Sequence, residues 1–112
     1  MEINISDEHC PVRKTLDIIG GKLIMLIILQ INDRTLRYGE LKRCIPEISE
    51  KMLLAQLKFL NAKGFVEKQS FAEIPPRVEY SLTPLGKNLL PVINEIAKFG
   101  LEQLTTTSTK PQ

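Results

Sequence analysis

The chain has 112 residues, of which 43% are hydrophobic and 25% charged, a composition typical of one soluble globular domain. The longest apolar run, residues 23–29, is far shorter than the roughly 20 residues of a membrane-spanning helix, so we expect no membrane association. The acidic N-terminal segment lacks the basic and apolar regions of a secretory signal, which predicts a cytoplasmic protein.

The basic charge is concentrated in the middle of the chain. The sequence has 15 Lys and Arg residues against 13 Asp and Glu residues, and residues 34–68 hold eight of the basic side chains but only four acidic ones. A local positive patch is typical of a surface that binds phosphates, although a solvated helix face gives the same pattern. The charge alone leaves both interpretations open.

Two helices are predicted over residues 10–31. Pro11 suits the first position of a helix, and the apolar residues of segment 11–20 recur at spacings of four and three. The glycine pair at residues 20–21 interrupts this pattern. Residues 22–31 are apolar nearly all round, which predicts a second helix buried in the centre of the domain.

A helix-turn-helix unit is predicted over residues 36–64. Its first helix fits residues 38–44. Ser49 has the side chain of an N-cap for a second helix that begins at Glu50, and Gly64 stands where a residue with positive φ would end that helix. The inner stripe of the second helix consists of leucines at helical spacing: Leu53, Leu57 and Leu60.

A two-stranded hairpin is predicted over residues 65–82. Residues 65–71 and 78–82 have the composition of strands, and the second segment alternates apolar and polar side chains. The connection between them contains two successive prolines, which stiffen the tip of the hairpin.

A long helix is predicted over residues 83–104. Thr83 followed by Pro84 is an N-cap followed by proline at the first helical position. The apolar residues beyond it alternate at spacings of four and three, which indicates an apolar stripe that packs against another helix. Pro91 should bend this helix, and residues 105–112 lack an apolar face and are expected to form a frayed tail.

This order of elements predicts a single winged helix-turn-helix domain over residues 1–112, mainly α with a small β-hairpin. The helix over residues 49–63 would enter the major groove of DNA with its N-terminal end. Side chains of this helix, the preceding helix and the wing are the expected DNA contacts: Tyr38, Lys42, Arg43, Ser49, Lys51, Met52, Ala55, Gln56 and Arg77.

These side chains offer different contacts. Gln56 can pair bidentately with adenine, whereas Lys51 suits either a guanine or a phosphate. Arg77 follows the two prolines of the wing tip, where it would touch the adjacent backbone or the minor groove. Tyr38, Lys42 and Arg43 would hold phosphates from the preceding helix.

Several motifs occur in a fixed order between residues 10 and 100. They are Cys10-Pro11, Ile19-Gly20-Gly21-Lys22, Leu36-Arg37-Tyr38-Gly39-Glu40-Leu41, Ile48-Ser49-Glu50-Lys51-Met52-Leu53 and Pro75-Pro76-Arg77-Val78-Glu79-Tyr80-Ser81-Leu82-Thr83. In this order and spacing the chain resembles the HxlR family of bacterial transcriptional regulators. The resemblance implies a homodimer that binds a pseudo-palindromic DNA operator, and we expect a repressor.

The resemblance also implies that the first and last helices are dimerisation helices. Their apolar side chains are the expected interface: Val12, Leu16, Leu89, Val92, Ile93, Ile96 and Phe99. The chain departs from the family at Leu23, where tryptophan is usual, and at Leu54 and Ala55, where polar residues are usual. The first change is interpreted as a core substitution, and apolar side chains on the reading face suit thymine methyl groups or phosphate-dominated binding.

The two cysteines are predicted to differ in role. Cys10 can occupy the N-cap of the first helix, where the helix dipole and two basic neighbours favour its thiolate and two acidic neighbours oppose it. Some HxlR regulators sense oxidants or electrophiles through the cysteine at this position, in certain members through a disulfide to the other subunit. The resemblance implies such redox sensing for Cys10, with a purely structural thiol as the alternative. Cys44 lies beside Leu41 on the predicted inner face, so we expect it in the core rather than as a resolving partner.

An enzyme is not expected. His9 is the only histidine, so the chain lacks the residues for a Ser-His-Asp triad or a metal site, and we expect neither a metal nor a cofactor. Two other functions remain open. One is a winged-helix module that binds a protein, suggested by Leu54 and the apolar seam of the last helix. The other is a regulator of the same fold switched by an unknown small molecule between the dimer helices.

Overall fold

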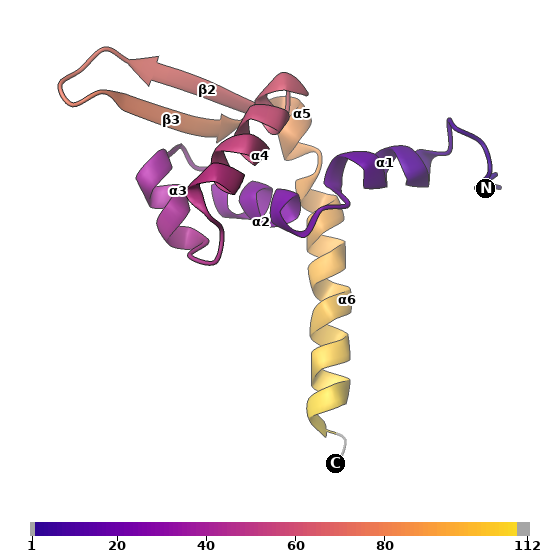
Figure 1. Cartoon of the computed structure of the whole chain (residues 1–112). Helices are drawn as coiled ribbons and strands as arrows, with labels where there is room; N and C mark the ends of the chain where they lie inside the picture. Colours follow the sequence, from indigo (N-terminus) through magenta and orange to yellow (C-terminus); the bar gives the residue numbers. More distant parts are fainter. Residues whose placement is uncertain (1, 110–112) are drawn as a thin grey trace.

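The helix α2 (Lys22–Ile31) lies at the centre of the fold (Figure 1). The computed structural model describes residues 2–109. Within α2 the side chains of Ile27, Ile28 and Ile31 are fully buried, and most of its other apolar side chains are partly buried against the same core. This agrees with the central buried helix that the sequence predicts.

The helix-turn-helix forms around α2 as predicted. It consists of α3 (Tyr38–Cys44) and α4 (Glu50–Ala62). The backbone N–H of Met52 donates to Ser49 Oγ over 3.1 Å, which makes Ser49 the N-cap of α4. Gly64 has a φ of 83° and ends the helix in the left-handed conformation.

The wing contains three strands rather than two. The strands β2 (Val66–Phe71) and β3 (Arg77–Leu82) pair antiparallel, and β1 (Leu36–Arg37) pairs with the other edge of β3. A strand of two residues is too short to show alternation, so β1 could not be found from the sequence pattern. Its pairing with β3 ties the start of α3 to the wing.

The C-terminal region forms two helices instead of one bent helix, so that prediction is wrong. They are α5 (Pro84–Lys87) and α6 (Leu90–Thr109). Pro91 is the second residue of α6, where its missing N–H removes no hydrogen bond. The expected frayed tail is also wrong as far as residue 109, because α6 continues through it. Residues 110–112 lie outside the described part of the chain.

Two helices project from the body of the fold (Figure 1). The helix α1 (Pro11–Ile19) extends to one side, and α6 extends as a long rod whose C-terminal half contacts no other element in the view. Within residues 2–109, no helix combines the length and the apolar character needed to cross a lipid bilayer.

Gly86 allows α5 to approach the backbone just before β2 closely. Its N–H donates to Thr83 Oγ1 over 3.0 Å, and a Cβ atom at this position would stand 2.1 Å from the carbonyl oxygen of Phe65. Because that neighbour is backbone, a side chain cannot be accommodated by a simple rotamer change.

We therefore expect Gly86→Ala to lower the free energy of unfolding by about 2 kcal/mol, since the backbone must shift to relieve the overlap. Urea denaturation followed by circular dichroism measures the change. Gly100→Ala on α6 is the matched control, because among the described residues no atom outside its neighbours and the backbone of its own helix lies within 4 Å of its Cβ position. Equal denaturation midpoints for the Gly86→Ala and parent proteins would exclude a tight contact between Gly86 and the Phe65 backbone.

Candidate nucleic-acid interface

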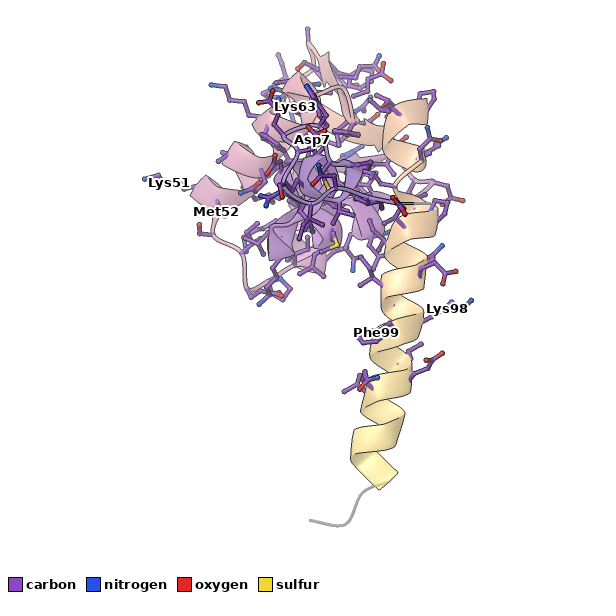
Figure 2. The ribbon with its side chains drawn as sticks, turned by 90° about the vertical axis from the view of Figure 1, so that its right-hand side faces the viewer. Asp7, Lys51, Met52, Lys63, Lys98 and Phe99 are labelled. Atoms are coloured by element: carbon purple, nitrogen blue, oxygen red, sulfur yellow. The ribbon has the colours of Figure 1, made fainter. Side chains whose placement is uncertain are left out.

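The outer face of α4 is exposed over its N-terminal half. Lys51, Met52 and Ala55 are all exposed, and Figure 2 shows Lys51 and Met52 pointing outward from the body on the side away from α6. Gln56 is half-buried, and its Nε2 donates to Met52 Sδ over 3.3 Å. On the opposite face the predicted leucine stripe is buried in the core: Leu53, Leu57 and Leu60.

The burial of one face of α4 and the exposure of the other fix the rotation of this helix about its axis. Burying each leucine contributes about 1.5–3 kcal/mol, so the helix cannot rotate about its axis without losing much of that stabilisation. The N-terminal backbone amides of α4 and the positive end of its dipole therefore face outward together with Lys51. Such an arrangement can hold an anion or read the edges of bases.

The predicted contacts on α3 are partly engaged within the chain. Arg43 is exposed, whereas Lys42 is half-buried and its Nζ donates to the carbonyl oxygen of Pro46 over 3.4 Å. This contact spans the turn between the two helices. Lys42 thus supports the turn, while the Arg43 guanidinium faces solvent.

Tyr38 lies at the edge of a groove between the helix-turn-helix and the wing. The groove has a volume of about 780 Å³. It is lined by residues of α3, α4 and the hairpin, among them Arg37, Tyr38, Glu50, Leu54, Lys68 and Ile74. The Tyr38 hydroxyl is buried and has no hydrogen-bond partner among the described residues. Burial, and then the nearby Glu50 carboxylate, raise the pKa of Tyr38 above its ordinary value, so the hydroxyl keeps its proton and remains a donor.

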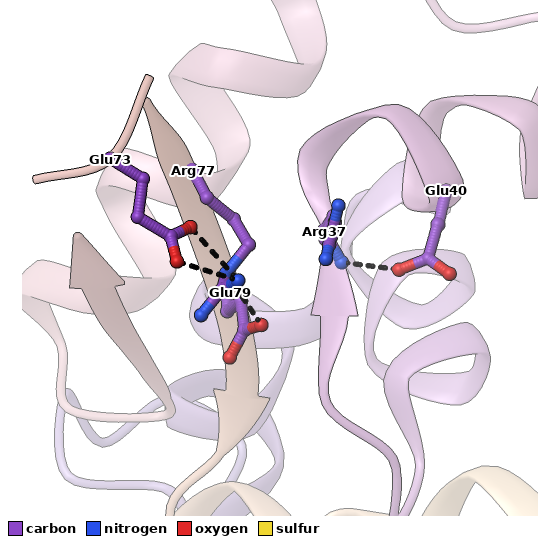
Figure 3. A network of polar contacts seen from close by, with 5 residues as sticks. All are labelled: Arg37, Glu40, Glu73, Arg77 and Glu79. Carbon is purple, nitrogen blue, oxygen red and sulfur yellow. Dashed lines mark hydrogen bonds and ion pairs between the residues drawn. The ribbon is translucent and has the colours of Figure 1, made fainter. Parts of the chain in front are cut away.

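Arg77 is held within the wing instead of facing outward (Figure 3). Its Nη1 lies 2.9 Å from Glu73 Oε2, and its Nε lies 3.1 Å from Glu79 Oε2. The second contact is an ion pair without hydrogen-bond geometry, since Nε has no hydrogen-bond partner within residues 2–109. The guanidinium carbon also stands 4.1 Å from the centre of the Phe71 ring. Two carboxylates therefore neutralise the side chain that we expected to touch DNA.

The apolar residues expected at a dimer interface divide into two groups. Five of them are exposed on α1 and α6: Val12, Leu16, Val92, Ile96 and Phe99. Ile93 is only 4% exposed and belongs to the core, and Leu89 is half-buried against that core. These two side chains face inward because α6 begins against α2, so they are not part of an open seam.

The structure confirms the predicted position of Cys10 and contradicts that of Cys44. Cys44 is exposed, so its predicted core position is wrong; Ile45, the residue after α3, takes the buried position instead. Cys10 is the N-cap of α1 and is only 2% exposed. The Cys10 N–H donates to the Asp7 carbonyl oxygen over 3.0 Å, and Arg13 Nε donates to the Ile5 carbonyl oxygen. These contacts fold the N-terminal segment back onto the start of α1.

Comparison with known proteins identifies the family. The sequence pattern of the HxlR-like helix-turn-helix family matches residues 18–108, most of the chain. The chain belongs to the HxlR family. The sequence is 43% identical over 97 residues to YdzF of Bacillus subtilis (strain 168), an HTH-type transcriptional regulator, and the match covers 86% of this chain and 89% of YdzF.

Solved structures of other regulators have the same fold. A MarR-family regulator from Porphyromonas gingivalis W83 is 65% identical, with a TM-score of 0.85 over 88% of this chain and 97% of that one. The redox regulator HypR in its oxidized form is 39% identical, with a TM-score of 0.78 over 83% of this chain and 96% of that one. This HxlR-family protein is therefore a transcriptional regulator of the helix-turn-helix type and not an enzyme.

Two cationic residues of the groove between the helix-turn-helix and the wing, Arg37 and Lys68, were missed at the level of the sequence. Leu54 is 50% exposed at its edge, and Arg37 and Lys68 contribute cationic side chains. The signal for Lys68 was present, because it lies two residues beyond the buried Val66 on β2 and therefore on the same face of that strand. Its approach to Tyr38 depends on the pairing of β3 with both β1 and β2, which a local pattern does not contain.

Proposed function

We propose that this HxlR regulator is a homodimeric repressor that binds a pseudo-palindromic DNA operator with α4 in the major groove. One observation carries the proposal: α4 presents an exposed N-terminal half with Lys51 and Met52 while its opposite face is fixed in the core. A helix that reads bases needs both properties, since its outer side chains must reach the groove in a set orientation.

The side chains of this face suit a mixture of base and phosphate contacts. Gln56 needs only to give up a weak thioether acceptor to pair with adenine. Met52 and Ala55 offer apolar contact to thymine methyl groups. Ser49 and the amides at the start of α4 would meet phosphate, as would the exposed Arg43 on α3.

The exposed apolar side chains of α1 and α6 support the homodimer. Val12 and Leu16 of α1 face Val92 and Ile96 of α6 across a shallow apolar groove. Further along α6, Phe99 is 65% exposed. A second copy that covers these side chains would remove them from water. It would also place two α4 helices for half-sites about 34 Å apart.

Lys51→Gln tests the role of α4. We expect weaker binding to operator DNA and a smaller dependence of the binding constant on salt, with the slope against log salt reduced by about 1, because one phosphate contact is lost. Fluorescence anisotropy at several salt concentrations measures both.

Lys98→Gln is the matched control, since Lys98 is an exposed lysine on α6 whose only described ion pair is with Glu95 (Figure 2). An unchanged salt slope for Lys51→Gln would contradict the docking of α4. Specific binding to a protein instead of DNA would favour a winged-helix interaction module.

Ile96→Glu tests the dimer. We expect the variant to sediment as a monomer and to bind a two-half-site operator at least tenfold more weakly, because a carboxylate would be buried among apolar side chains of both copies. Sedimentation velocity and anisotropy measure the two effects. Lys98→Gln again serves as the control, and a dimeric Ile96→Glu protein would exclude this face as the interface.

We further propose that Cys10 makes the regulator sensitive to oxidants. Its position at the N-cap of α1 supports this, because it couples the thiol to a proposed dimerisation helix. The relative HypR is named a redox regulator. With hydrogen peroxide, the Cys10 thiolate would attack one oxygen, forming an S–O bond as the O–O bond breaks. The sulfenic acid remains on Cys10, and the leaving hydroxide takes up a proton to become water.

Oxidation would then change the spacing of the two α4 helices through α1. We expect hydrogen peroxide to release the parent protein from operator DNA and to leave Cys10→Ser bound, as measured by anisotropy. Cys44→Ser is the matched control. Release of Cys10→Ser at the same peroxide concentration as the parent would exclude the switch and leave the DNA-binding proposal intact.

A further inference from the structure

The tip of the wing, residues 72–76, presents an apolar side chain to solvent. Ile74 is fully exposed, with a relative exposure of 102%, and the two residues that follow it are prolines. Exposed isoleucine costs free energy in water, and this one stands at the end of a projecting hairpin (Figure 1). The tip of the wing therefore carries an exposed hydrophobic side chain.

The basic side chain that follows this tip, Arg77, is neutralised within the wing. Arg77 is paired with Glu73 on one side and Glu79 on the other, and it packs over Phe71 (Figure 3). Residues 72–76 themselves contain no lysine or arginine. The tip thus lacks the free cation that a wing needs to bind a phosphate electrostatically. The same contacts join both sides of the loop, so Arg77 positions Ile74.

The tip also lies beside the proposed reading helix. Ile74 and Pro75 line the same groove as Tyr38 of α3 and Glu50 and Leu54 of α4. With α4 in the major groove, one sugar-phosphate strand would pass between α4 and the wing. The far side of that strand is the minor groove, so Ile74 stands where the minor groove would open.

We propose that Ile74, backed by Pro75, is a wedge that enters the minor groove next to α4 and bends the operator. Isoleucine and proline side chains partly unstack a base step when inserted there, which kinks DNA toward the major groove. Steps of pyrimidine followed by purine unstack most easily, so the wedge would add sequence preference at a position that α4 does not touch. This inference rests on the proposed docking of α4.

Ile74→Ala is the main test. The probe is a duplex of about 30 base pairs selected from a random-sequence library by the parent protein, with a dye on each end. We expect the parent to shorten the distance between the ends, as measured by energy transfer. We expect Ile74→Ala to bind about tenfold more weakly with a smaller bend, because the inserted side chain is lost. Since Ile74 is fully exposed, the variant should keep the circular dichroism spectrum of the parent.

Ile74→Lys distinguishes insertion of the side chain into the minor groove from a wing tip that only lies close to the DNA. A lysine at the tip cannot replace an apolar wedge, so we expect a loss of bending even at low salt. Ala72→Lys is the matched control, because it adds the same charge two residues away at another exposed position and should keep the bend.

Three results would overturn the wedge. One is a straight duplex in the parent complex. The second is a bend and affinity in Ile74→Ala equal to those of the parent. The third is tighter binding by Ile74→Lys with an unchanged bend, which would place the tip beside phosphates outside the groove. In each of these cases the parent still binds DNA, so the proposed function stands. A parent that selects no duplex from the library would overturn both proposals.

Discussion

The burial of α2 is the constraint on which the rest of the structure depends. Its three central isoleucines are fully buried, and α3, α4, α6 and β3 all pack against the helix. A helix without a polar face has to be covered on all sides, so the surrounding elements share one core. The angle between α3 and α4, the start of α6 and the base of the wing are set by their contacts with this one helix.

Much of the fold could be predicted because its boundaries depend on local chemistry. Ser49 caps α4 through a hydrogen bond to a residue three positions away, and Gly64 ends the same helix through its own φ. Thr83 caps α5 in the same way as Ser49 caps α4. Helix caps and helix ends of this kind depend on residues a few positions apart, so a short window of the sequence is enough to predict them.

The errors concern features that depend on distant contacts. β1 forms because its two residues pair with an edge of β3. Arg77 is neutralised because the hairpin brings two glutamates to it. Cys44 and Ile45 compete for one buried position at the end of α3, and helical periodicity does not decide between neighbours. The buried and exposed faces of α4 could therefore be predicted, because spacing sets them, whereas the surroundings of Arg77 on the wing could not.

The separation of the two faces of α4 has a consequence for the divergence of these regulators. The residues that hold the helix in place, such as Leu53 and Leu57, are distinct from those that face outward, such as Lys51 and Ala55. A substitution on the outer face leaves the core packing intact and changes stability little. Duplicated copies of such a gene can therefore acquire new outer residues on α4 without passing through unfolded intermediates. A single scaffold then supplies many paralogues whose outward chemistry differs while their architecture is kept.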